Sequence, residues 1–193
     1  MHEASAAARE LGFPVAVKSN SARWTGRLDR EGARLDLSDA TSVVTAFSEL
    51  SALTGEDALH VQKMAPKGLG LIVEVNETSS FGPVMSFGLS GTLFDRLGDR
   101  SYRAVPLAVE DAQDLMAEPR AAGLLTGGAD PADVDAVADL LLRVSALVEQ
   151  IPEIRGIELD PVLASSEGVN VLRAVIRVGP VPTLADTGPR RLG

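Results

Sequence analysis

The chain has 193 residues, of which 45% are hydrophobic, and 18 basic and 27 acidic residues give it a formal net charge of -9. This length fits one domain, or one domain with two lobes, and an acidic chain without a basic block is a poor nucleic-acid binder. The lack of cysteine excludes disulfides, thiolate metal sites and cysteine nucleophiles, and two histidines are too few for a multi-histidine metal centre.

Nothing in the sequence indicates a membrane protein or a secreted one. No stretch approaches the run of about 18 apolar residues that a membrane span needs. The N-terminus from Met1 to Ser5 lacks the charged and then apolar plan of a signal peptide. We therefore expect a cytoplasmic protein.

The first third of the chain predicts two helices and three strands. Residues 3–11 are helical in pattern and are closed by Gly12. A second helix is capped by Ser38 or Asp39 and places Val43, Phe47 and Leu50 on its apolar face. The predicted strands are residues 13–18, 33–37 and 59–64. The polar segment 19–32 and its flank hold the most basic patch, made of Arg23, Arg27, Arg30 and Arg34.

The middle of the chain predicts a hairpin followed by a glycine turn. Residues 59–64 and 71–75 read as the two strands of the hairpin, because Gly68 and Gly70 mark a turn between them. The stretch 81–95 then reads as a strand, a turn at Gly88 and Gly91, and a second strand ending in Asp95. Main-chain N–H groups of such a turn can hold an anion, whereas a plain β-turn is the alternative.

The last part predicts two helices and a strand pair. A turn and short strand cover 98–107, and a helix covers 109–117. A second helix starts at Asp130-Pro131 and runs to about Gln150. Strands 155–163 and 169–178 are joined at Glu167-Gly168, and residues 181–193 read as a flexible tail. Because strands outnumber helices and cluster as hairpins, the fold class is α+β, mostly antiparallel.

The order of these segments resembles the ATP-grasp module of the ADP-forming acyl-CoA synthetases, or acetate–CoA ligases, which are related to succinyl-CoA synthetase β subunits. No single piece is specific, but seven pieces in the right order and spacing are. The matching pieces are residues 12–18, 61–66, 71–73, 81–88, 99–103, 141–145 and 158–161. The resemblance implies a two-lobed ATP-grasp-like module over residues 1–180, with mostly antiparallel sheets and a cleft between the lobes. The module begins later than in the family, so we expect a fragment or one end of a longer polypeptide.

The resemblance also implies a site for ATP. Lys18 matches a lysine that reaches the nucleotide phosphates, and its alternative is a solvated lysine at the end of a strand. Residues 62–64 match the hinge whose main chain pairs with adenine, and the alternative is an ordinary interior strand. The implied cofactor-binding residues are Lys18, Gln62, Lys63, Met64, Gly88, Gly91 and Arg103.

Glu158 and Asp160 are the candidate metal ligands. Their spacing on a strand puts both carboxylates on one face, and hard oxygen ligands suit Mg²⁺. The alternative is a solvent-facing side of the strand. The family has an acid and then an asparagine here, so Asp160 keeps an oxygen ligand and adds charge.

Several departures from the family concern its chemistry. The place of the family's phosphate-relay histidine falls on Gly26, and neither His2 nor His60 is near it. The family's last-strand aspartate, a metal ligand, falls on Arg173, whose guanidinium would pair with the two carboxylates and fill the place of a cation. Further departures are Gly70 for an acid, Ser90 for a glycine and Asp95 for a glutamate. We therefore expect a weak Mg²⁺ site, an impaired phosphate relay and no catalytic residue in this chain.

Three functions stay open at this point. The first is a nucleotide-binding ligase module. The second is a non-catalytic, degenerate module that docks on or regulates a partner domain, and the third is an unrelated α+β binding domain. The resemblance implies a CoA-binding or acetyltransferase domain or subunit as partner. The sequence leaves a homo-oligomer, the acyl substrate and the nucleotide base open.

Overall fold

The computed structural model describes residues 2–21, 23–24, 32–78, 81–91, 96–127 and 130–181. The chain forms two compact units, Met1–Ala65 and Pro66–Gly193, and each is described here on its own. Gly26, Arg27, Asp95 and the predicted tail beyond residue 181 lie outside the described residues. The cleft expected between the two lobes stays a prediction.

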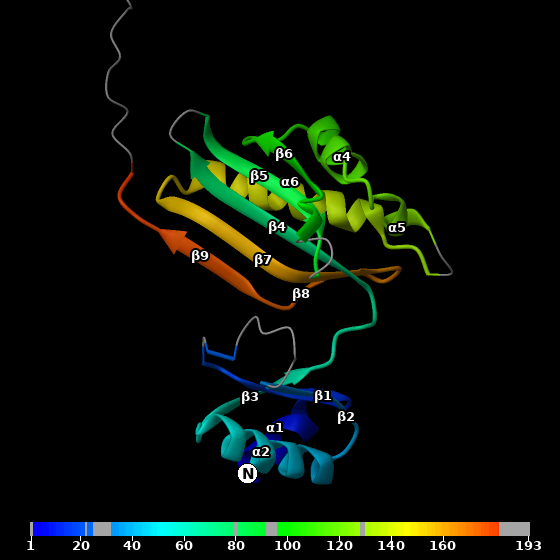
Figure 1. Ribbon diagram of the computed structural model, residues 1–193, viewed down its shortest axis with the longest axis vertical. Coiled ribbons are helices and arrows are strands. Elements are labelled where there is room, and N and C mark those ends of the chain that lie inside the picture. Colours follow the sequence, from blue (N-terminus) through cyan, green and yellow to red (C-terminus); the bar gives the residue numbers. More distant parts are fainter. Residues whose placement is uncertain are drawn as a thin grey trace, which may run out of the picture. The chain divides into compact units, whose positions relative to one another are not determined.

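The first unit is a three-stranded antiparallel sheet with two helices packed on one face (Figure 1). Val15 and Val17 are fully buried against Val43 and Leu50. Because side chains alternate along a strand, Lys18 lies on the face of the sheet that is turned away from the helices. The elements are α1 (His2–Leu11), β1 (Val15–Ser19), β2 (Ala33–Leu37), α2 (Ala40–Thr54) and β3 (Leu59–Lys63), and the strand order is β2-β1-β3.

The two ends of α2 follow from local signals in the sequence. Of the two predicted caps, Asp39 is the one used, because its carboxylate accepts from the Ser42 N–H at 2.8 Å. The helix stops at Gly55, which has a φ of 74° and donates its N–H to the Ser51 carbonyl. A left-handed residue at this position is a common helix end, and glycine adopts it without strain.

The second unit is a six-stranded antiparallel sheet covered on one face by helices (Figure 1). The strand order is β6-β5-β4-β7-β8, and β9 pairs with β7 beyond the end of β8. The strands are β4 (Leu69–Thr78), β5 (Gly82–Leu89), β6 (Arg100–Ala104), β7 (Ile154–Ser165), β8 (Gly168–Val171) and β9 (Ala174–Val178). The helices are α4 (Val109–Ala117), α5 (Gly123–Thr126) and α6 (Val134–Gln150). The α+β class with mostly antiparallel sheets is confirmed.

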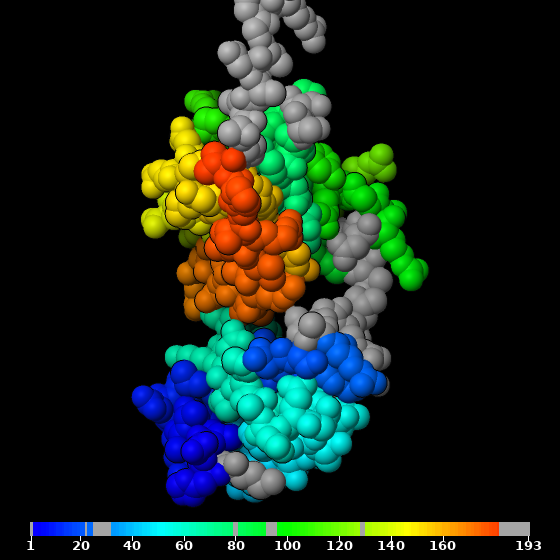
Figure 2. All heavy atoms as spheres, turned by 90° about the vertical axis from the view of Figure 1, so that its left-hand side faces the viewer, coloured from blue at the N-terminus to red at the C-terminus, as the bar shows by residue number. Residues whose placement is uncertain are grey.

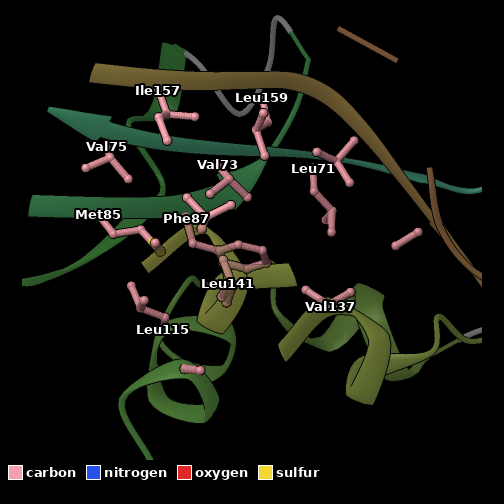
Figure 3. Packing of buried hydrophobic residues seen from close by; sticks show 14 of the residues in the cluster. Leu71, Val73, Val75, Met85, Phe87, Leu115, Val137, Leu141, Ile157 and Leu159 are labelled. Atoms are coloured by element: carbon pink, nitrogen blue, oxygen red, sulfur yellow. The ribbon is translucent and has the colours of Figure 1, made fainter. Parts of the chain in front are cut away.

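The core of the second unit lies between the sheet and its helices. Phe87 and Leu141, both fully buried, meet in the middle of this layer (Figure 3). The sheet contributes alternate residues of its central strands and the helices contribute one apolar stripe each, which is the pattern that periods of 2 and 3.6 residues predict. Hence the intervening residues of β4, β5 and β7 lie on the other face of the sheet.

The predicted hairpin between residues 59–64 and 71–75 is wrong. β3 pairs with β1 in the first unit, whereas β4 pairs with β5 and β7 in the second. Gly70 therefore lies inside β4 and not in a turn. The chain leaves the first sheet at Ala65-Pro66, where proline has no N–H to continue the ladder. Sequence proximity favoured the hairpin, but the division between units passes between the two strands.

Two further boundaries differ from the predictions. The helix expected to start at Asp130-Pro131 begins at Val134, because Asp133 accepts from the Ala136 N–H and is the cap. The strand expected over 169–178 is interrupted at Leu172 and Arg173, although the register with β7 continues across the gap. Arg173 consequently lies opposite Asp160, whose N–H donates to the Arg173 carbonyl at 3.2 Å.

The outer strand β9 is exposed. It lies on the surface in Figure 2, coloured orange to red, and Val178 is 71% exposed. Within the described part of the chain, no helix is long and apolar enough to cross a membrane.

Candidate functional site

Lys18 and Gln62 lie together on the helix-free face of the first sheet. The Lys18 Nζ donates to the Gln62 Oε1 at 2.8 Å, and both side chains are half-buried. Burial lowers the pKa of the Lys18 ammonium below its ordinary value of 10.5. Among the described residues no carboxylate forms an ion pair with Lys18, so an amide oxygen is the partner of its charge. An anion would meet an ammonium that is partly desolvated and has no counter-charge among the described residues.

The main chain of β3 offers hydrogen-bonding groups at the open edge of the first sheet. The Met64 N–H donates to the Pro14 carbonyl at 3.1 Å, so Met64 turns its main chain toward β1. Hydrogen-bonded and non-hydrogen-bonded residue pairs alternate along an antiparallel ladder. The main-chain N–H and carbonyl of Gln62 therefore also face β1, and those of Lys63 face the open edge. Of the predicted hinge residues 62–64, Lys63 is the one whose main-chain N–H and carbonyl face the open edge, and the hinge role of these residues stays a prediction.

Gly88 and Gly91 differ from each other in what they do. Gly88 lies inside β5, so the turn predicted at this residue is wrong. A Cβ on Gly88 would come within 2.7 Å of the Asp99 carbonyl oxygen, so the glycine permits the close approach of the chain entering β6. Gly91 has a φ of 127° and carries the bend after β5, and the strand expected beyond it lies outside the described residues.

Glu158 and Asp160 lie on the same face of β7, as their spacing predicts, and each has a partner. The Arg173 Nη1 lies 2.5 Å from the Glu158 Oε1, forming an ion pair. The Ser90 Oγ donates to the Asp160 Oδ1 at 2.7 Å. The expected pairing of Arg173 is confirmed for Glu158, whereas the side-chain partner of Asp160 is Ser90.

The same face carries a second ion pair beside the first. Glu74 lies directly opposite Glu158 in the register of β4 and β7. Like charges on directly opposed residues destabilise a sheet, and here each glutamate is flanked by an arginine. Arg100 of β6 pairs with Glu74, and Arg173 pairs with Glu158. We use the name charged face for this side of the sheet, formed by Glu74, Arg100, Glu158, Asp160, Arg173 and Arg177.

The residues of the charged face do not form a ready metal site. No group of three or more potential ligand side chains is found among the described residues. The two predicted ligands, Glu158 and Asp160, already hold a guanidinium and a hydroxyl. Their donor set is therefore a poor fit to a divalent cation, which requires carboxylate oxygens that are free to coordinate.

Arg103 is not brought together with the other predicted residues of the second unit. It faces helix α4, where its guanidinium lies 2.5 Å from Glu118 and 3.5 Å from Asp114. The hydrogen bond from Arg103 lowers the pKa of Glu118. These contacts fasten β6 to α4 on the helix side of the sheet. The predicted role of Arg103 in ligand binding stays a prediction.

The sequence reading missed Glu74 and Arg100 as members of the charged face. A signal for Glu74 is present, because it is the one charged residue in the apolar run 71–75. A charge at an interior strand position requires a partner, and the register supplies Arg100. That register depends on how three successive strands, β4, β5 and β6, pair with one another, so Arg100 could not be chosen from the chain alone.

Comparisons with known proteins agree with this architecture. A model of the ATP-grasp domain family matches residues 1–178. The "Acetate--CoA ligase [ADP-forming] I" of Archaeoglobus fulgidus is 34% identical over 178 residues, covering 88% of this chain and 26% of that protein. The chain thus spans about a quarter of the length of this relative. The "Acetate--CoA ligase [ADP-forming] I subunit beta" of Pyrococcus furiosus is 30% identical over 164 residues, covering 80% of this chain and 71% of that protein.

Solved structures of the acetyl-coenzyme A synthetase 1 of Candidatus Korarchaeum cryptofilum are also similar. One, in complex with coenzyme A and Ca-AMPCP, has a TM-score of 0.83 and 32% identity, covering 92% of this chain and 82% of that chain. Another contains coenzyme A and Mg-AMPPCP, with a TM-score of 0.81, 33% identity and the same coverage. The chain belongs to the ATP-grasp domain family, as a module of the type found in ADP-forming acyl-CoA synthetases.

Proposed function

We propose that this chain binds ATP as the nucleotide-binding module of a protein similar to ADP-forming acyl-CoA synthetases. The observation that carries the proposal is Lys18, a half-buried ammonium whose contact is the neutral Gln62 amide. Burying a charge without a counter-charge is unfavourable for folding, and functional sites are where proteins keep such groups. A nucleotide phosphate would supply the missing negative charge.

Main-chain groups of each unit, taken separately, support the same proposal. Lys63 presents its N–H and carbonyl at the open edge of β3, where the adenine ring would bind. Gly91, with its positive φ, carries the bend that follows β5, and N–H groups at such a bend are suited to phosphate oxygens. The proposed Mg²⁺ site at Glu158 and Asp160 is weak, since both carboxylates have partners already.

We further propose that the phosphate relay of the family is impaired in this chain and that a separate domain completes its function. Gly26 occupies the relay position, and a glycine has no side chain to carry a phosphoryl group. The similar Pyrococcus furiosus protein is a β subunit, which favours a partner subunit or a fused domain for this chain too. A CoA-binding domain or an acetyltransferase domain is the proposed partner.

A second function has one observation in its favour. The ion pair between Arg173 and Glu158 occupies carboxylates that a catalytic module would give to a metal. A module that binds nucleotide without turning it over would act as a docking or regulatory unit. The two functions differ in turnover and agree in nucleotide binding.

The test is isothermal titration of ATP into the unmodified chain and into Lys18→Met and Lys67→Met variants. Losing one charge-assisted contact to phosphate should weaken ATP binding about tenfold or more in Lys18→Met. Lys67 is an exposed lysine outside the proposed site, so Lys67→Met should bind as the unmodified chain does. Thermal unfolding supplies a second readout, because Lys18→Met removes a half-buried charge that forms no ion pair among the described residues, and its removal should not destabilise the chain.

Two results would refute the proposal. One is the absence of ATP binding by the folded, unmodified chain. The other is an equal loss of affinity in the Lys18→Met and Lys67→Met variants, which would reduce the effect to general electrostatics.

A further inference from the structure

The charged face has no net charge, whereas a surface that binds a divalent cation usually carries excess negative charge. Its three carboxylates, on Glu74, Glu158 and Asp160, are matched by three guanidiniums, on Arg100, Arg173 and Arg177. A magnesium ion is held in proteins by carboxylates whose negative charge is not already balanced.

Most N–H donors of the Arg173 guanidinium form no hydrogen bond within the described residues. A guanidinium has five N–H donors, and one contact, to Glu158, is made within the described residues. The Arg173 side chain is 38% exposed, so part of the guanidinium is accessible to an anion from solution. Arginine binds phosphate in a planar, bidentate manner while one edge of its fork stays on a carboxylate.

Arg173 is also held in place. Glu158 lies on β7, an interior strand of the sheet, and the Asp160 N–H is bonded to the Arg173 carbonyl. The residue therefore has an anchored main chain and an anchored side chain. A cation positioned in this way does not have to be recruited from solution, as a bound metal ion does.

We infer that Arg173 is a phosphate-binding residue that takes the place of the divalent cation, so that nucleotide binding by this chain is independent of Mg²⁺. This inference rests on the proposed function, since it requires that the chain binds ATP. Its ligand class is a nucleoside triphosphate free of metal. The Glu158 carboxylate acts as a positioning residue for the guanidinium, and Ser90 keeps Asp160 engaged.

The test measures ATP affinity by titration calorimetry in excess MgCl₂ and in excess EDTA, for the unmodified chain and for Arg173→Asp and Arg177→Asp. The unmodified chain should bind ATP with the same affinity, within about threefold, in both buffers. Arg173→Asp should weaken binding in EDTA about tenfold or more and regain affinity when Mg²⁺ is added, because three carboxylates then converge. Arg177→Asp makes the same change of charge on the same face, next to Asn76, and should stay independent of Mg²⁺.

The outcomes distinguish failure of this inference from failure of the proposed function. If the unmodified chain binds ATP only with Mg²⁺, and Arg173→Asp behaves identically, the inference is overturned while the proposed function stands. If the folded chain binds no ATP in either buffer, both are overturned. Should Arg173→Asp fail to fold, Arg173→Gln removes the charge at nearly constant size and must weaken binding in EDTA. Equal affinity of Arg173→Gln and the unmodified chain in EDTA overturns the inference.

Discussion

Arg173 and Glu158 form an ion pair, but substituting the arginine should destabilise the second unit more than substituting the glutamate. The side chains are 38% and 28% exposed, so the pair lies between exposed pairs, worth about 0.2–1 kcal/mol, and desolvated charged hydrogen bonds, worth about 1.5–3 kcal/mol. A coupling of about 1 kcal/mol follows. Arg173→Gln loses this contact and also leaves Glu158 directly facing Glu74, so its total loss should be about 1–2 kcal/mol.

Glu158→Gln should be the milder change. It loses the same contact with Arg173 but relieves the repulsion from Glu74, so its loss should be about 0.5 kcal/mol or less. Urea unfolding followed by far-UV circular dichroism, on both single variants and the double variant, gives the free energies of the cycle. Trp24, the only tryptophan, belongs to the first unit, so its emission reports that unit separately.

Arg177→Gln is the matched control for this cycle. Arg177 lies on the same face of β9 and contacts the neutral Asn76 amide, so its loss should not couple to Glu158→Gln. Equal losses in Arg173→Gln and Glu158→Gln would refute the role assigned to Glu74. A coupling below about 0.3 kcal/mol, which is the usual error of such cycles, would refute the ion pair itself.

Three other outcomes are expected. Leu141→Ala, at a fully buried position facing Phe87, should lower the free energy of unfolding by about 2–5 kcal/mol in urea titrations, and an effect below about 1 kcal/mol would contradict this packing. The Ser42 N–H lowers the pKa of Asp39 below its ordinary value of 3.8, so its carboxylate stabilises α2 above that pH and ceases to as pH falls through the lowered pKa. The unmodified chain should therefore lose stability relative to Asp39→Asn below about pH 4, and parallel pH curves for the two proteins would contradict the cap. Incubation with γ-labelled ATP should leave no acid-labile phosphate on the chain, because the resemblance to the family assigns its relay position to Gly26; an acid-labile label on His60 would refute this.

Local signals predicted the individual elements well. The strand 33–37 and the helix 109–117 have the predicted bounds, and Asp39 and Gly55 end α2 through contacts that span at most four residues. The start of α6 was ambiguous, because Asp130 and Asp133 both precede an apolar helical pattern. Only the hydrogen bond from the Ala136 N–H to the Asp133 carboxylate identifies the cap. Such boundaries depend on which N–H groups remain without partners, and the order of residues does not specify that.

The pairing of strands was harder to predict, because it depends on contacts between distant segments. The alternation of Glu158 and Asp160 on one face was readable, since a strand has a fixed period of two. The arginines that neutralise this face could not be predicted equally well from the sequence. Arg173 was reached through the resemblance to the family, whereas Arg100 is 58 residues from Glu158 in sequence and joins the charged face only through the register of β6, β5 and β4.

The charged face also shows why a sheet of this kind can keep its fold without a metal. Glu74 and Glu158 are opposed in register, so the sheet needs positive charge on this face whether or not chemistry takes place there. A metal ion can meet that need, and so can arginines on the flanking segments, as Arg100 and Arg173 do here. The arginines are present as soon as the chain folds, whereas a metal ion has to bind. Under the inference above, stability and nucleotide binding at this place depend on the same guanidinium, so losing the Arg173 charge should lower both, and Mg²⁺ should restore both only when an acidic side chain replaces it.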